Sequence, residues 1–236
     1  MHVNNEIGVI QDIEAIGKIC RERKIIFHVD AAQSAGKVEI NLEELPVDLM
    51  SFSAHKIYGP KGIGALYVRS ILPRVKLDSM LFGGGQERGI RSGTLNVPGI
   101  VGFAKAIEIA NDEMKTENIR FKKWTDTMFK ELSKVGAKLN GHPTTRLAHN
   151  LNIRFECIES KAIINSVSKK LAISAGSACT TQMVEPSHVL LALGLNEEQT
   201  HSAIRIGCGR FNTDEEIEIA TDEILNVHES LTKIQI

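Results

Sequence analysis

Helical and strand-like segments alternate early in the chain, and this alternation limits the choice of fold more than any other pattern. Isoleucines at positions 13, 16 and 19 form the apolar stripe of a helix that follows Asp12. The apolar runs 24–30 and 47–53 are typical of buried strands. Because alternating helices and strands build βαβ units, the pattern predicts an α/β fold with a mostly parallel sheet.

Charged side chains stand where the two predicted strands end. Asp30 closes the first strand, and Lys56 follows the second, just before the turn formed by residues 59–62. Ligands of open α/β sheets bind outside the carboxyl ends of the strands. A lysine there can form a Schiff base with a carbonyl group when its neighbours keep part of it unprotonated. The alternative is a solvated lysine at a strand end.

Two other features of the first half suit a charged ligand. A buried carboxylate is costly unless a cation pairs with it, so Asp30 would suit a protonated ring nitrogen. The alternative for Asp30 is a helix N-cap or a surface carboxylate. The segment 83–94 contains five glycines, two arginines and a threonine, and such a loop suits an anion such as phosphate. Glycine-rich loops are common, so this signal is weak alone.

The rest of the chain predicts further helices and strands. Strands are expected at 63–69, in an orientation that can be antiparallel after the tight turn, at 151–155 and at 202–207. Helices are expected at 97–135, 160–171 and 214–233. The composition changes near residues 111–118, which predicts two domains, 1–113 and 114–236.

Composition and charge exclude several classes of protein. Apolar residues make up 42% of the 236 residues and charged residues 24%, as in a globular protein. The net charge of −1, without a basic block, argues against nucleic-acid binding. No apolar run approaches the roughly 20 residues of a membrane span, and no signal peptide is evident, so we expect a cytoplasmic protein, or a mitochondrial matrix protein in a eukaryote.

The four cysteines have no regular spacing, which disfavours a disulfide framework or a metal site. Most of them, Cys20, Cys157 and Cys208, are expected to be small buried side chains. Cys179 differs because its neighbours are almost all small, so its loop can leave the thiol exposed.

Five segments together resemble one known family. They occur in this order: Asn4-Asn5-Glu6-Ile7-Gly8, His28-Val29-Asp30-Ala31-Ala32-Gln33-Ser34, Ser53-Ala54-His55-Lys56-Ile57-Tyr58-Gly59-Pro60-Lys61-Gly62, residues 83–94, and Ser177-Ala178-Cys179-Thr180. The same segments in the same order are found in cysteine desulfurases of the group that supplies sulfur for iron–sulfur cluster assembly. The combination is far more specific than any single segment.

The resemblance implies a pyridoxal 5′-phosphate (PLP) enzyme of the aspartate-aminotransferase fold (fold type I), normally a homodimer. Lys56 would hold the cofactor as a Schiff base. Five further residues would bind PLP: Asp30 at the ring nitrogen, Gln33 and Asn5 near the phenolate oxygen, and Ser53 and His55 at the phosphate. Thr94 would reach the phosphate across the dimer interface. Arg205 would hold the substrate carboxylate, beside Asn5, and Cys179 would accept the sulfur.

The implied activity converts L-cysteine to L-alanine and leaves a persulfide on Cys179, from which a scaffold or sulfur-carrier protein takes the sulfur. Members of this family carry further strands, a phosphate loop and a ring-stacking histidine ahead of the residue that matches Met1. We therefore expect residues 1–113 to be the C-terminal part of the large PLP-binding domain, with an incomplete sheet, and residues 114–236 to be the small α/β domain with the cysteine loop.

Two alternatives stay open. One is a selenocysteine lyase or another class V aminotransferase-like enzyme, and the other is a truncated, non-catalytic remnant. Cys179 favours the desulfurase over aminotransferases, which need no nucleophilic thiol.

Overall fold

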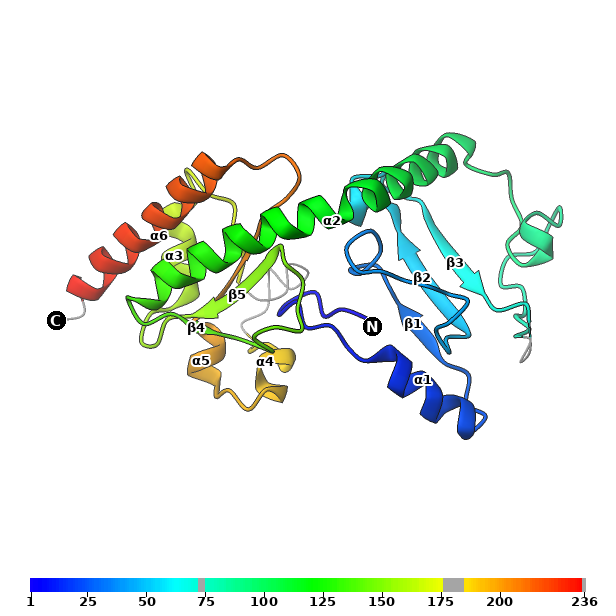
Figure 1. The fold of residues 1–236 in the computed structure, drawn as a ribbon, viewed down its shortest axis with the longest axis horizontal. Coiled ribbons are helices and arrows are strands. Elements are labelled where there is room, and N and C mark those ends of the chain that lie inside the picture. Colours follow the sequence, from blue (N-terminus) through cyan, green and yellow to red (C-terminus); the bar gives the residue numbers. More distant parts are fainter. Residues whose placement is uncertain (72–74, 176–184, 235–236) are drawn as a thin grey trace. The chain divides into compact units, whose positions relative to one another are not determined.

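The computed structural model describes residues 1–71, 75–175 and 185–234 of the chain. They form two compact units (Figure 1). Unit 1 contains Met1–His2 and Gln11–Met114, and unit 2 contains Val3–Ile10 and Lys115–Ile236. The long helix α2, Val97–Ser133, contributes its first part to unit 1 and the remainder to unit 2. The assignment of the units as a cofactor domain and a small domain stays a prediction.

Unit 1 contains a three-stranded sheet in the order β1-β2-β3. The strands are β1 (His28–Asp30), β2 (Leu49–Ser53) and β3 (Gly64–Val68). β1 and β2 are parallel, whereas β3 returns antiparallel to β2, as the tight turn before it allows. The predicted α/β class is confirmed, and this part of the sheet has one parallel and one antiparallel pair.

Helix α1 (Ile13–Glu22) precedes the sheet, and Asp12 caps it by accepting a hydrogen bond from the backbone N–H of Ala15 at 2.8 Å. The strand predicted from residue 24 begins only at His28. Lys24 has a positive φ of 57°, which ends the helix in a turn, and Ile25 and Ile26 are exposed. The prediction from the apolar run that this strand begins at residue 24 was therefore wrong.

The first part of α2 packs on the turns that follow β1 and β2. Phe103, Ala106 and Ala110 form a buried cluster with Ala54 and Ile57. Gly36, at φ +65°, permits a close approach, because a Cβ atom there would lie 2.6 Å from the Cβ of Ala110. The two turns at the carboxyl ends of the parallel strands therefore rest on one helix.

Unit 2 contains an antiparallel sheet in the order β4-β5-β6. Its strands are β4 (Lys138–Leu139), β5 (Asn150–Arg154) and β6 (Ala203–Gly207). Its helices are the second part of α2, α3 (Ser160–Val167), α4 (His188–Ala192), α5 (Glu197–His201) and α6 (Asp214–Ile234). Helix α3 ends four residues before the predicted Leu171.

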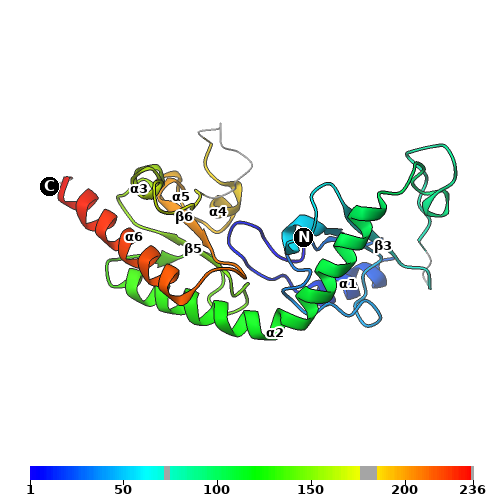
Figure 2. The same ribbon diagram turned by 90° about the horizontal axis from the view of Figure 1, so that it is seen from above.

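Helix α6 lies alongside the second part of α2 (Figures 1 and 2), and both cover the sheet of unit 2. The buried core joins Trp124 and Met128 of α2, Ile153 of β5, Ile204 of β6 and Ile224 of α6. The aromatic and Met side chains on this part of α2 therefore belong to the core.

Three findings bear on the excluded classes. No helix in the described part of the chain is long and apolar enough to cross a membrane. The described residues also contain no group of three His, Cys, Asp or Glu side chains that could hold a metal ion. Cys20 and Cys208 are partly buried, but Cys157 is exposed, so the prediction of burial was wrong there. Cys157 lies in a turn with a positive φ of 70°.

Candidate functional site

The carboxyl ends of β1 and β2 meet at one edge of the unit 1 sheet. Because these strands are parallel, with Asp30 opposite Ser51, the residues that follow each strand leave the sheet on the same side. A single turn of 3₁₀ helix, η1 (Ala54–Ile57), follows β2 and contains Lys56. The prediction that Asp30 and Lys56 stand at one edge is consistent with this topology.

Lys56 is preceded by a hydrogen-bonded pair of side chains. The hydroxyl of Ser53 lies 2.9 Å from Nδ1 of His55. His55 and Lys56 are exposed, Ser53 is half-buried, and Ala54 and Ile57 anchor the turn in the core. Tyr58, with a left-handed φ of 65°, ends the 3₁₀ turn. A hydroxyl, an imidazole and an amine are therefore presented to solvent within four residues.

Asp30 is exposed rather than buried. One carboxylate oxygen accepts a hydrogen bond from the backbone N–H of Ala32 at 2.8 Å. This local bond corresponds to the surface alternative, and it leaves the second oxygen able to accept a proton or hydrogen-bond donor from a ligand. On the same face of the sheet, Nε2 of His28 lies 2.6 Å from the hydroxyl of Ser51. Gln33, in the turn after β1, is half-buried.

Lys37 is a member of this region that the sequence did not single out. Burial, together with repulsion from the charge of Lys56, lowers the pKa of Lys37 from 10.5 to about 8. Two lysine side chains therefore influence one another at this edge, although nineteen positions separate them in the sequence. A lysine within a small-residue turn carries no sequence signal that it folds back toward a second lysine.

This donor set fits a phosphorylated aldehyde such as PLP. Lys56 offers the amine that an aldehyde requires, and Ser53 and His55 offer hydrogen-bond donors for phosphate oxygens. A phosphate dianion would also relieve the repulsion between Lys37 and Lys56. The chemistry at the edge of the sheet therefore agrees with the cofactor that the sequence predicts.

Thr94 stands at the end of the glycine-rich loop and is exposed. The loop closes on itself, because the side-chain oxygen of Gln86 accepts a hydrogen bond from the backbone N–H of Gly93 at 2.9 Å. Close to it, Met80 is 90% exposed and Phe82 is 87% exposed. The segment just before this loop therefore exposes large apolar side chains to solvent.

Unit 2 brings together Asn5 and Arg205. Arg205, on β6, donates a hydrogen bond from its guanidinium to the backbone carbonyl of Asn5 at 2.9 Å. The backbone of Arg205 also forms two hydrogen bonds with Ser174: its N–H donates to the carbonyl of Ser174 at 2.7 Å, and its carbonyl accepts from the N–H of Ser174 at 3.2 Å. The guanidinium is therefore fixed in direction, and its other N–H groups suit a bidentate contact with a carboxylate.

Cys179 lies outside the described residues. Of the other cysteines, Cys208 lines a cavity of about 310 Å³ between α2, α6 and β6, and burial raises the pKa of its thiol to about 12. A thiol with this pKa is a poor nucleophile at neutral pH, which favours a structural role for Cys208.

The predicted site residues are divided between the two units. Unit 1 contains Asp30, Gln33, Ser53, His55, Lys56 and Thr94, and unit 2 contains Asn5 and Arg205.

Comparison with known proteins gives one consistent result. The aminotransferase class-V family matches residues 1–219. A cysteine desulfurase IscS of Pseudomonas entomophila is 53% identical over 235 residues, which are 99% of this chain and 58% of that protein. A cysteine desulfurase IscS of Methylobacillus flagellatus is 58% identical over 219 residues, which are 92% of this chain and 54% of that protein.

The fold has a solved counterpart in a NifS-like protein from Rickettsia africae. That structure has a TM-score of 0.87 and 32% identity, over 97% of this chain and 60% of that one. The chain thus spans little more than half the length of the relatives it matches. The chain belongs to the class-V aminotransferase family.

Proposed function

We propose that this chain is the part of a PLP-dependent cysteine desulfurase that carries the cofactor lysine, the substrate arginine and the sulfur-accepting cysteine. One observation carries the proposal: the amine of Lys56 follows the hydrogen-bonded pair of Ser53 and His55 at the carboxyl end of a parallel strand. The identity of 53% to a cysteine desulfurase IscS over 99% of the chain supports the choice of reaction.

Six residues of unit 1 would hold the cofactor. Lys56 would bind its aldehyde carbon, Asp30 its ring nitrogen and Gln33 its phenolate oxygen, while the phosphate ligands would be Ser53, His55 and Thr94. When bound there, PLP supplies an electron sink that stabilises negative charge at the substrate α-carbon. The exposed carboxylate of Asp30 would keep the ring nitrogen protonated, which is the form that withdraws electrons.

Arg205 would select the substrate by its carboxylate. Its guanidinium is already oriented by Asn5, so little side-chain entropy is lost when L-cysteine binds. Asn5 would lie beside the substrate and the phenolate oxygen. This role is consistent with the half-buried position of Asn5 next to Arg205.

The sulfur chemistry would be performed by two side chains. The amine of Lys56 would take the α-proton of the substrate and return protons to the product. The thiolate of Cys179 would attack the substrate sulfur, which breaks the bond between that sulfur and the β-carbon. The organic product is L-alanine, and Cys179 keeps the sulfur as a persulfide until a scaffold or carrier protein takes it.

We also propose that the protein works as a homodimer. The exposed side chains of Met80 and Phe82 stand in the segment that leads to Thr94, which would reach the phosphate of the second copy. Burying them in an interface would remove a large apolar area from water. The compartment would be the cytoplasm of a bacterium, or the mitochondrial matrix of a eukaryote, where thiols and persulfides persist.

Reductive trapping would test the cofactor assignment. The protein is incubated with PLP, reduced with borohydride and digested, and the peptide that gains the pyridoxyl mass is sequenced. We expect the label on Lys56 and none in Lys56→Ala, whereas Lys61→Ala should label as the wild type does, because Lys61 is an exposed lysine on the turn that follows. A label distributed over several surface lysines would contradict the assignment.

An activity measurement completes this test. Sulfide release from L-cysteine should fall at least 10³-fold in both Lys56→Ala and Cys179→Ser, since each removes a group that takes part in the chemistry. Wild-type sulfide release from Cys179→Ser would refute the assigned sulfur acceptor. Release of selenide from selenocysteine, without release of sulfide from L-cysteine, would establish a selenocysteine lyase instead.

A further inference from the structure

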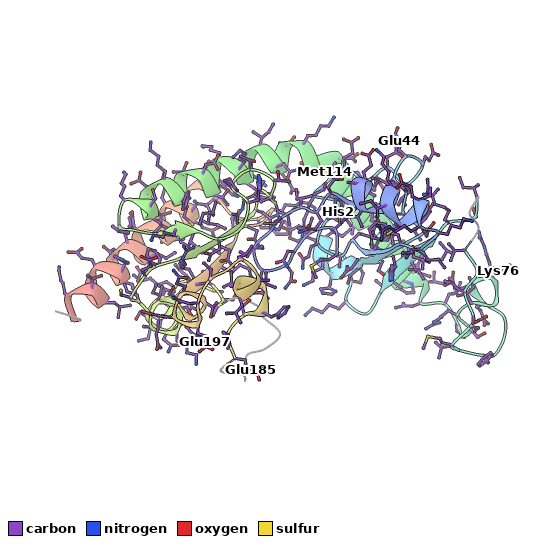
Figure 3. All side chains as sticks on the ribbon, turned by 90° about the horizontal axis from the view of Figure 1, so that it is seen from below. His2, Glu44, Lys76, Met114, Glu185 and Glu197 are labelled. Atoms are coloured by element: carbon purple, nitrogen blue, oxygen red, sulfur yellow. The ribbon has the colours of Figure 1, made fainter. Side chains whose placement is uncertain are left out.

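Residues 4–8 of unit 2 form a tight turn, which begins two positions after His2 (Figure 3). The side-chain oxygen of Asn4 accepts hydrogen bonds from two backbone N–H groups of this turn, from Glu6 at 2.9 Å and from Ile7 at 3.1 Å. A backbone N–H without such an acceptor would leave the turn free to open. One asparagine side chain therefore holds the N–H side of the turn.

Side chains from two neighbouring strands hold the carbonyl side of the turn. The amide of Asn152, on β5, donates to the carbonyl of Glu6 at 3.0 Å. Nη1 of Arg205, on β6, donates to the carbonyl of Asn5 at 2.9 Å. Asn152 and Arg205 are direct partners in the antiparallel register, so their side chains stand on one face of the sheet. Asn152 is fully buried, and its oxygen accepts from Asn140 at 2.7 Å, which fixes the direction of its amide.

The turn held in this way leaves donor groups for a ligand. The side-chain amide of Asn5 has no hydrogen-bond partner among the described residues. Because Nη1 of Arg205 is occupied, the edge formed by its Nε and Nη2 remains for a ligand. Arg210 uses the same edge in this unit, since its Nε and Nη2 contact the two carboxylate oxygens of Glu117. The free edge of Arg205 therefore suits a carboxylate.

We propose that Asn4 and Asn152 are positioning residues for substrate recognition: they hold the turn from opposite sides and so keep the carbonyl of Asn5 where it orients Arg205 toward a carboxylate. Neither asparagine touches the substrate or PLP in this role. Without either of them the turn can shift, and Arg205 loses the acceptor that keeps its free edge in one direction. This inference rests on the proposed function for the identity of the substrate, an amino acid.

Amide hydrogen exchange tests how the turn is held, on the protein without PLP. In Asn4→Ala we expect the N–H groups of Glu6 and Ile7 to exchange about tenfold faster, because both lose their acceptor. Asn4→Ser keeps a side-chain oxygen that can accept these bonds and adds no charge, so its exchange should stay within about threefold of the wild type. Wild-type exchange in Asn4→Ala would overturn the inference.

The consequence for binding is measured with L-alanine and L-alaninamide, because only the first has a carboxylate. Ligand-observed NMR gives the affinity of each for the protein without PLP. We expect the wild type and Asn4→Ser to prefer L-alanine at least about tenfold. In Asn4→Ala, Asn152→Ala and Arg205→Ala this preference should fall below about threefold, because a misdirected guanidinium loses its bidentate contact. Full preference in either asparagine-to-alanine variant, or no preference in the wild type, would overturn the inference.

A matched control separates positioning from stability. Asn152 is fully buried and Asn4 half-buried, so their alanine variants should differ in stability and yet lose the preference equally. Leu132→Ala, at a fully buried side chain of α2 that belongs to neither the turn nor the strands, should destabilise unit 2 and keep the full preference. Loss of the preference in Leu132→Ala would overturn a positioning role. If Asn152→Ala does not fold, the comparison of Asn4→Ala with Asn4→Ser still decides.

Kinetics distinguish this inference from the proposed function. With PLP bound, KM for L-cysteine should rise about tenfold in Asn4→Ala while kcat changes less than threefold, because Lys56 belongs to the other unit and is untouched. A fall in kcat at unchanged KM would overturn the inference. A wild-type protein that prefers L-alanine but releases no sulfide from L-cysteine would refute the proposed function, and the positioning of Arg205 would still be supported.

Discussion

Polar side chains at the candidate site of unit 1 differ in burial from those around Asn5 and Arg205 in unit 2. In unit 1, Asp30, His55 and Lys56 are exposed. In unit 2, by contrast, Glu6 and Asn152 are almost completely buried and bonded to one another. Exposed groups can adapt to a ligand and cost little when they are removed. Buried groups have their geometry set during folding, and removing one leaves its partners without a hydrogen bond.

This difference suits the proposed division of labour. A cofactor bonded covalently to Lys56, as proposed, would supply much of the binding energy itself. The side chains around it would then need no hydrogen-bond network formed in advance. The carboxylate of a small substrate and the sulfur acceptor must be brought to a fixed geometry, and errors of about 1 Å are costly in catalysis. A rigid network around Asn5, Glu6 and Arg205 is what such a site requires.

The largest effect on stability is expected from Asn152→Ala. Asn152 is fully buried; its side-chain oxygen accepts from Asn140 at 2.7 Å, and its amide donates to the carbonyl of Glu6 at 3.0 Å. The substitution leaves both partners buried and unsatisfied, so the free energy of unfolding should fall by roughly 3 kcal/mol. Urea unfolding followed by the fluorescence of Trp124, the single tryptophan, reports on unit 2.

Asn226→Ala provides the control, because Asn226 lies exposed on α6 in the same unit. Its unfolding free energy should stay within about 0.5 kcal/mol of the wild type. Equal, small effects of the two substitutions would mean that the buried amides do not set the geometry of unit 2, and the contrast between the units would be lost.

The second effect concerns Lys37, a partly buried lysine of unit 1 whose pKa is influenced by Lys56. Its pKa falls from 10.5 to about 8 on folding, chiefly because it is buried. Between these pH values the unfolded chain binds a proton that the folded protein has released, so stability rises with pH through this interval. Lys37→Met should remove that rise and increase the free energy of unfolding at pH 7 by about 2 kcal/mol.

Thermal unfolding followed by circular dichroism from pH 7 to pH 10.5 measures this effect. Lys61→Met, at an exposed lysine of the same unit, should keep the wild-type pH dependence. A wild-type protein whose stability falls as the pH rises from 8 to 10 would contradict the burial of a neutral Lys37. The prediction concerns the protein without PLP, because phosphate bound nearby would hold the proton on Lys37.

Local patterns predicted much of the fold. The helix α1, the antiparallel return of β3 and the helix α2 were each predicted from neighbouring residues, and each was confirmed, although Ile16 and Ile19 of α1 are exposed. The start of β1 was wrong because Ile25 and Ile26 look like strand residues but are exposed in a turn. Exposure is decided by what packs on a segment, and the segment itself carries no sign of that.

Local spacing groups candidate site residues only where they are close in sequence, whereas the family resemblance placed Asn5 beside Arg205. Ser53, His55 and Lys56 fall within four positions, so a motif shows them together. The contact of Glu6 with Ser187 and the approach of Lys37 to Lys56 join distant positions through the tertiary fold. Glu6 stood within a recognised segment, and its burial has no counterpart in the sequence.

The smallest effect on stability and the clearest effect on binding should occur together in His55→Ala. Its bond to Ser53 is exposed, so the free energy of unfolding should change by less than about 0.5 kcal/mol. Loss of one phosphate ligand should nevertheless weaken PLP binding by about tenfold, since a hydrogen bond to a charged group is worth roughly 1.5 kcal/mol. Titration with PLP, followed by its absorbance, measures the affinity, and Lys61→Ala is the matched control.

If His55→Ala unfolded as readily as Asn152→Ala, the unit 1 edge would be a structural network after all. If PLP affinity were unchanged as well, His55 would not be a phosphate ligand, and the resemblance would have misassigned it.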